Sequence, residues 1–142
     1  MAENISAENK ERITIILHST AYDRVSCALC MALAALSTGT EAHILLTAEG
    51  IKRFTKDNLT NIGEETPLRL HAEIQEGLEK GAMQPLDEQL ACAKEMGLKI
   101  YACPNAMATY NIAKRNLVGV DKLMGLVTFL KLASGAQANW YI

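Results

Sequence analysis

The sequence lacks the long apolar runs and the one-sided charge that mark membrane proteins and nucleic-acid-binding proteins. No apolar run approaches the ~20 residues of a membrane-spanning helix, and the polar first twelve residues contain no secretory apolar segment. The 14 lysines and arginines against 16 acidic residues give a net charge of −2, which supplies no basic surface for nucleic acid or anionic lipid. We therefore predict a cytoplasmic protein that binds neither nucleic acid nor membranes.

Several motifs that carry chemistry are also missing. No G-x-G-x-x-G follows the first apolar run, and neither a P-loop nor a G-x-S-x-G occurs, so nucleotide binding and serine hydrolysis have no support. A zinc site would need ligands beyond Cys27 and Cys30, and no second C-x-x-C and no H-x-x-x-H is present. We expect no metal and no organic cofactor.

What the sequence does contain is an alternation of short apolar runs and amphipathic segments. The runs predict strands at residues 13–17, 43–47, 98–102, 120–123 and 138–142. Capping residues and helical periodicity predict helices at residues 24–37, 66–80, 85–96, 106–115 and 126–133. This alternation predicts a single-domain, three-layer α/β fold over residues 12–142, with a mobile polar tail at 1–11. The sheet is expected to be mainly parallel and five-stranded, in the flavodoxin-like order 2-1-3-4-5.

Cys103 stands where the third predicted strand meets the start of a helix. Pro104 cannot continue a strand ladder and is a good first residue for a helix. A thiol at that junction faces unpaired backbone N–H groups, which favour a thiolate. Ligands and catalytic groups also collect at the carboxyl ends of parallel strands. Cys103 is therefore the candidate nucleophile; the alternative is a small buried core residue.

The predicted strand order places the first and third strands side by side, so the loop after His18 and the turn at Cys103 would line one crevice. There His18 is a candidate for holding a proton near Cys103 or for steadying an anionic substrate, and the alternative is a structural histidine. The candidate substrate-binding residues are Ser19, Pro104, Asn105 and Met107.

The remaining cysteines offer a second possibility. Cys27 and Cys30 form a C-x-x-C, a redox spacing in βα proteins, but they lie about a turn inside a predicted helix, which favours buried structural cysteines instead. Cys92 shares an apolar helix face and is interpreted as core. In a reducing compartment all four cysteines are expected to be free thiols.

The predicted helix at 24–37 is apolar nearly all round. One sheet face cannot cover such a helix, so a second partner is implied, and we predict a homo-oligomer.

The segments ITIILHSTAYDR, HILLT with AEGIKRF, LKIYAC and the closing VTFLKLASGAQANWYI resemble the DsrE/DsrF-like family of small sulfur-relay proteins, and LKIYAC is the most specific of them. The resemblance implies that Cys103 accepts sulfane sulfur as a persulfide and passes it to an acceptor thiol. It also implies sulfur donor and acceptor proteins as partners, and assembly as trimers or hexamers.

The leading interpretation is thus a sulfur carrier or sulfurtransferase that uses Cys103. Two alternatives stay open. One is a dithiol oxidoreductase that uses Cys27 and Cys30, and the other is a non-catalytic module for small-ligand binding or assembly.

Overall fold

Five short parallel strands form the centre of the structure, a computed structural model that describes residues 11–142. Apart from Glu11, the predicted mobile tail lies outside the described residues. The strands are β1 (Arg12–Leu17), β2 (Glu41–Leu46), β3 (Lys99–Ala102), β4 (Lys122–Leu123) and β5 (Ala138–Tyr141). Every pair of neighbouring strands is parallel. The predicted α/β class and five-stranded sheet are confirmed.

The order of the strands differs from the prediction. It is β4-β3-β2-β1-β5, so β2 lies between β1 and β3 and the first and third strands are not side by side. From β1 to β4, each strand lies next to the strand that precedes it in the chain, and β5 lies on the other side of β1. The direction of each step depends on tertiary packing, which the local apolar pattern does not encode.

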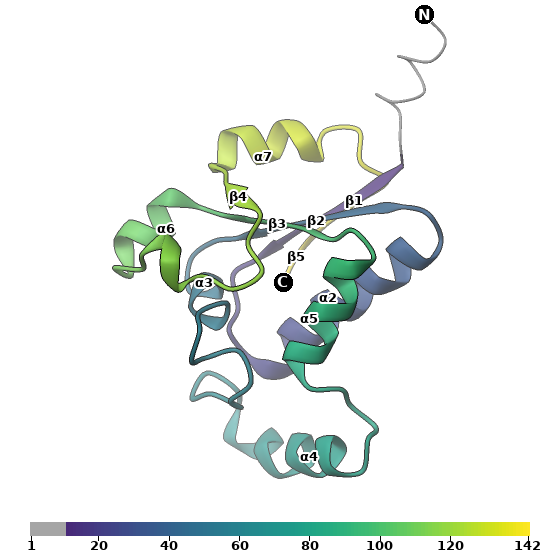
Figure 1. The fold of residues 1–142 in the computed structure, drawn as a ribbon, viewed down its shortest axis with the longest axis vertical. Helices are drawn as coiled ribbons and strands as arrows, with labels where there is room; N and C mark the ends of the chain where they lie inside the picture. Colours follow the sequence, from purple (N-terminus) through teal and green to yellow (C-terminus); the bar gives the residue numbers. More distant parts are fainter. Residues whose placement is uncertain (1–10) are drawn as a thin grey trace, which may run out of the picture.

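Helices cover both faces of the sheet (Figure 1). Helices α2 (Tyr22–Ser37) and α5 (Leu86–Glu95) lie together on one face, and α7 (Leu126–Ala133) lies on the other. Right-handed crossovers explain this division: connections that step one way leave their helices on one face, and the connection that steps back leaves its helix on the opposite face. The remaining helices are α3 (Gly50–Arg53), α4 (Leu68–Glu79) and α6 (Pro104–Thr109).

The main core fills the space between the sheet and the layer of α2 and α5. Its fully buried members include Ile15, Leu17, Val25, Leu29 and Ile44. Helix α5 packs beside α2, where the side-chain amide of Gln89 donates to Ser26 Oγ at 3.0 Å. Part of the apolar α2 surface that predicted a second subunit is therefore covered by a helix of the same chain.

Helix α6 is shorter than the helix predicted at 106–115. It begins at Pro104, and Tyr110 already follows its last residue, Thr109. Asn111 then adopts a left-handed backbone conformation with a φ of 53°. Asn tolerates this conformation better than most residues, and a helix cannot continue through it. A 3-10 turn at Lys114–Asn116 follows.

Candidate functional site

Cys103 occupies the junction between β3 and α6 that the sequence predicts. Its backbone is extended, with φ −74° and ψ 121°, and Pro104 is the first residue of α6. The Cys103 N–H donates to the Leu46 carbonyl at 3.0 Å, and the Cys103 carbonyl accepts from the Met107 N–H at 3.1 Å. The thiol is therefore held by a strand on one side and a helix on the other, at the carboxyl edge of the sheet.

The thiol belongs to the side of the sheet that α7 covers. Side chains alternate along an extended chain, so Cys103 shares its face with Tyr101, two residues earlier. The Tyr101 ring contacts Phe129 of α7 edge-on, with 6.1 Å between ring centroids. Cys103 is 4% exposed, and no hydrogen-bond partner of its thiol occurs among the described residues. The result is a sheltered thiol that no neighbouring polar group engages.

The segment between β3 and α7 is fixed beside Cys103. The Met124 N–H donates to the Ala102 carbonyl at 3.0 Å, and the Asp121 carboxylate accepts from the Ile100 N–H at 2.7 Å and from Lys94 Nζ. Burial alone would raise the pKa of Asp121, but the hydrogen bonds from Lys94 and Ile100 and the nearby lysine charges outweigh it, so the pKa lies below its usual value. An ionised Asp121 thus anchors β4 to β3.

His18 is not placed beside Cys103. Its N–H donates to the Ile142 carbonyl at 2.8 Å, and its ring stacks on Tyr141 with 4.1 Å between centroids. Because β2 separates β1 from β3, about two strand spacings, roughly 10 Å, lie between the two strand ends. The prediction that the His18 loop and Cys103 line one crevice is therefore wrong, because it depended on the first and third strands being adjacent.

The predicted substrate-binding residues lie in two places, one beside His18 and the other beside Cys103. Ser19 lies with His18, and its Oγ accepts from the Ala21 N–H at 3.1 Å. Pro104 and Asn105 are exposed on the first turn of α6, and Met107 is half-buried on the next turn. The structure thus gathers Pro104, Asn105 and Met107 around Cys103 and leaves Ser19 on the far side of β2.

Arg53 is the polar residue that sequence reasoning missed. It is 2% exposed, and its guanidinium donates to the carbonyls of Thr20, Asn58, Asn61 and Ile62. Burial lowers the pKa of this guanidinium, which nevertheless stays charged at neutral pH. Arg53 therefore ties the loop at 56–65 to the β1–α2 loop. The sequence signal available for Arg53 was its place beside two large apolar residues, Ile51 and Phe54, both of which are buried in the structure.

The start of α2 is capped from a distance. Ala21 occupies the N-cap position of α2 and makes no side-chain cap. Thr66, which is 44 residues away, accepts from the Tyr22 N–H at 2.9 Å instead. The 56–65 loop is thus held at both ends, by Arg53 and by Thr66.

A second buried polar network lies on the α7 side of the sheet. His43 Nδ1 is 2.8 Å from the Tyr101 hydroxyl, and His43 Nε2 is 3.2 Å from a Glu41 carboxylate oxygen. The two bonds fit one neutral tautomer, in which Nε2–H donates to Glu41 and Nδ1 accepts from the Tyr101 hydroxyl. Burial, followed by the charges of Asp121 and Glu41, raises the pKa of Tyr101. The network fixes the strand that leads to Cys103.

The three remaining cysteines are exposed rather than buried. Cys27, Cys30 and Cys92 all have accessible side chains, so the predicted core positions are wrong. The inward stripe of α2 is formed by Val25, Ala28, Leu29 and Ala32 instead. Cys27 Sγ lies 3.9 Å from Met31 Sδ, and Cys30 Sγ lies 3.7 Å from the Gln89 side-chain oxygen.

The described residues contain no group of three or more His, Cys, Asp or Glu side chains placed to hold a metal ion. No helix among them is both long enough and apolar enough to cross a membrane.

The five-stranded parallel sheet with helices on both faces places the chain in the α/β class. The particular family follows from the sequence profile of the DsrE/DsrF-like family, which matches residues 11–139, and the chain belongs to that family. A search of curated proteins found no match.

Solved structures share the fold. A crystal structure of the YchN protein from E. coli aligns with a TM-score of 0.63 and 11% identity, covering 93% of this chain and 99% of that one. The protein of unknown function MTH1491 from Methanobacterium thermoautotrophicum has a TM-score of 0.58 and 12% identity, covering 92% and 99%. The conserved protein of unknown function BT1422 from Bacteroides thetaiotaomicron has a TM-score of 0.58 and 18% identity, covering 96% and 97%.

Proposed function

We propose that this chain is a sulfur carrier or sulfurtransferase that accepts sulfane sulfur as a persulfide on Cys103 and passes it to an acceptor thiol. The supporting observation is the position of Cys103 at the end of β3, where its backbone is fixed by Leu46 and Met107 while its thiol has no partner among the described residues. Membership of the DsrE/DsrF-like family is consistent with sulfur relay.

The transfer consists of two displacements at sulfur. The Cys103 thiolate attacks the outer sulfur of a donor persulfide, R–S–SH; a new S–S bond forms on Cys103, the S–S bond of the donor breaks, and the donor leaves as the thiolate R–S⁻. An acceptor thiolate then attacks the outer sulfur of the Cys103 persulfide and releases the Cys103 thiolate. Atoms and electrons balance in each step, so the cycle consumes no oxidant or reductant.

The environment of Cys103 suits this intermediate. Persulfides exchange their outer sulfur with stray thiols, and a position that is 4% exposed limits the approach of such thiols. The cycle also requires free thiols, so we place the protein in a reducing, cytoplasmic setting.

One observation favours the alternative dithiol mechanism, and one geometric requirement opposes it. Cys27 and Cys30 are exposed, so reagents can reach both. However, residues three apart in a helix have Cβ atoms about 5–6 Å apart, and a disulfide needs about 3.5–4.5 Å. Both cysteines lie inside the continuous helix α2, so their oxidation to a disulfide would require α2 to distort.

We also propose that the chain acts as a homo-oligomer with sulfur donor and acceptor proteins as its partners, as the resemblance implies. The outer surface of α2 supports assembly, because Met31, Leu33 and Leu36 remain only partly buried after α5 has packed. Light scattering is expected to give a mass above the 15.5 kDa of one chain. A monomer at micromolar concentration would contradict the assembly without touching the chemistry of Cys103.

The experiment that tests the function is peptide-level mass spectrometry after incubation with a persulfide donor. We expect an adduct of one sulfur, about 32 Da, on the Cys103 peptide, which disappears when a small acceptor thiol is added. The Cys103→Ser variant should show no transferable sulfur, whereas Cys27→Ala and Cys30→Ala should load as the wild type does. Transferable sulfur on Cys27 or Cys30, or none on any cysteine, would refute the proposal.

A further inference from the structure

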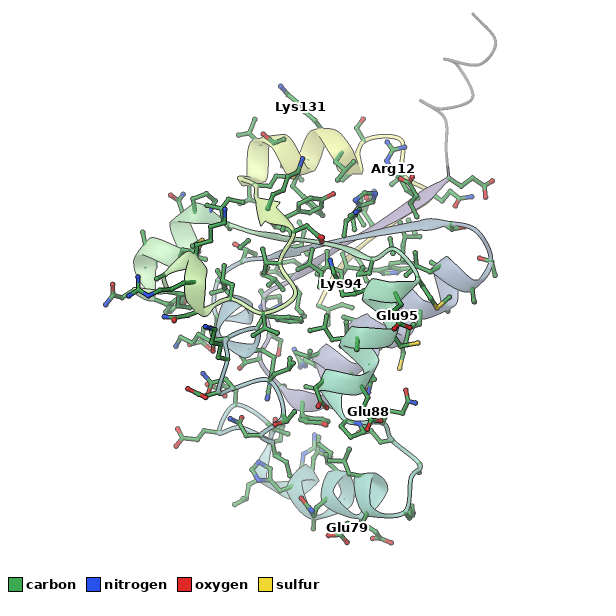
Figure 2. All side chains as sticks on the ribbon, viewed as in Figure 1. Arg12, Glu79, Glu88, Lys94, Glu95 and Lys131 are labelled. Carbon is green, nitrogen blue, oxygen red and sulfur yellow. The ribbon has the colours of Figure 1, made fainter. Side chains whose placement is uncertain are left out.

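Two segments of this chain carry net charges of opposite sign. Residues 64–95 carry eight acidic and three basic side chains, a net charge of −5, whereas residues 99–142 carry five basic and one acidic, a net charge of +4. Figure 2 shows Glu79 on α4 at one end of the long axis and Lys131 on α7 at the other. The total charge near zero therefore conceals two segments of opposite net charge, whose helices α4 and α7 lie at opposite ends of the long axis.

Exposed apolar side chains of β4 and α7, together with two lysines beside them, form what we call the α7 surface. It comprises Lys122 and Leu123 of β4 and Leu126, Val127, Leu130 and Lys131 of α7. The exposed fractions are 74% for Val127, 56% for Leu130, 45% for Leu126 and 39% for Leu123. The four α7 residues are spaced i, i+1, i+4 and i+5, so they form one continuous stripe, while Phe129 and Ala133 face the sheet.

The α7 surface lies next to Cys103. Leu123 pairs in register with Ala102, the residue before Cys103, and Lys122 Nζ lies 5.8 Å from the centre of the Tyr101 ring. On its other side the stripe continues into a groove of about 360 Å³ between α7 and β5, whose walls include Leu130, Trp140 and Tyr141. An apolar surface of this kind, edged by charge, is typical of a protein-binding site.

We infer that the α7 surface docks the protein that exchanges sulfur with Cys103, and that this partner presents an apolar centre with an acidic rim beside its own reactive cysteine. The inference rests on the proposed function of Cys103. Charge complementarity favours an acidic partner over a second copy bound through the same surface, because a two-fold contact would bring Lys122 and Lys131 of both copies together. The partner's carboxylates would meet these lysines, and its cysteine would approach the thiol next to Leu123.

Two synthetic peptide persulfides test this inference on the full chain. Each carries one persulfidated cysteine between leucines; one has glutamates at its ends and the other has lysines at the same positions. At low ionic strength we expect the glutamate peptide to load Cys103 about tenfold faster than the lysine peptide. The ratio should fall towards one near 1 M salt, where the Debye length is about 3 Å. The double variant Lys122→Glu with Lys131→Glu should reverse the preference.

A pair of matched variants locates the effect on the surface. Val127→Asp places a charge in the centre of the α7 surface and should slow loading by the glutamate peptide. Leu68→Asp adds the same charge on α4, where Leu68 is 83% exposed, and should leave loading unchanged. Equal loading by both peptides, or a preference that survives the double lysine variant, would overturn the inference. A lower mass of Val127→Asp in light scattering would also overturn it, because a second copy would then occupy the surface.

Inorganic polysulfide separates this inference from the function on which it rests. Loading of Cys103 by polysulfide with no difference between the peptides would refute only the docking surface. If polysulfide also fails to load Cys103, the proposed function fails and the docking inference fails with it.

Discussion

The carboxyl edge of the sheet is built in two different ways on the two sides of β2. On the β1 side, Arg53 is buried and its guanidinium donates hydrogen bonds to four backbone carbonyls. On the β3 side, the backbone of Cys103 is equally well fixed, but its thiol has no hydrogen-bond partner among the described residues. A polar group whose bonds are all satisfied holds loops in place, whereas an unengaged nucleophile on a rigid backbone is available for chemistry.

Removing Arg53 should produce the largest change in stability. Arg53→Met leaves the carbonyls of Thr20, Asn58, Asn61 and Ile62 without their donor, and we expect the free energy of unfolding to fall by about 3 kcal/mol. The matched control is Lys52→Met, since Lys52 is half-exposed and its ammonium lies near Glu49 and over the Tyr110 ring; its cost should stay below about 1 kcal/mol. Urea denaturation measures both, and equal losses would remove the distinction between the two sides of β2.

The accessibility of the thiols sharpens the same comparison. With a bulky aromatic disulfide reagent, Cys27, Cys30 and Cys92 should react at once in the native protein, because all three are exposed. Cys103 should react at least about tenfold more slowly until the chain is unfolded, because burial controls access to a thiolate. Time-resolved peptide mapping distinguishes the four sites. Early labelling of Cys103 would show that its surroundings are open in solution.

Acid should weaken the anchor that Asp121 provides beside Cys103. The folded-state pKa of Asp121 lies below its ordinary value, so its carboxylate stabilises the fold above the unfolded pKa of about 3.9, and this contribution is lost as the pH falls through the lower, folded-state value. At pH 6 we expect Asp121→Asn to cost about 1 kcal/mol.

Urea midpoints measured from pH 6 down to pH 3 test this anchor. The difference between the wild type and Asp121→Asn should shrink as the pH falls. Glu73→Gln on the exposed surface of α4 is the control and should show no such trend. A constant difference at all pH values would mean that the charge of Asp121 is not what joins β4 to β3.

The parts of this design that could be predicted from the sequence are the local ones. The run at 98–102, the proline after Cys103 and the polar start of the next segment suffice to predict a strand, a cysteine and a helix in that order. Helical periodicity likewise predicts α7 at 126–133, where the structure has it.

The parts that could not be predicted depend on distant contacts. The strand order decides whether His18 meets Cys103, and no local pattern encodes that order. Thr66 caps a helix 44 residues away, and Arg53 bonds to residues up to 33 positions distant. The exposure of Cys27 and Cys30 depends on which side of α2 faces α5. Each of these features becomes visible only when the elements are packed.

The central claim is that the most buried of the four thiols carries the sulfur, and two cysteine variants test it most directly. One keeps only Cys103, with Cys27, Cys30 and Cys92 changed to Ala; the other keeps those three and carries Cys103→Ser. After incubation with the same persulfide donor and then with an acceptor thiol, the variant that keeps Cys103 should deliver about one sulfur per chain, and the Cys103→Ser variant should deliver none. Sulfur delivered by the Cys103→Ser variant, together with none from a folded chain that keeps only Cys103, would contradict the account.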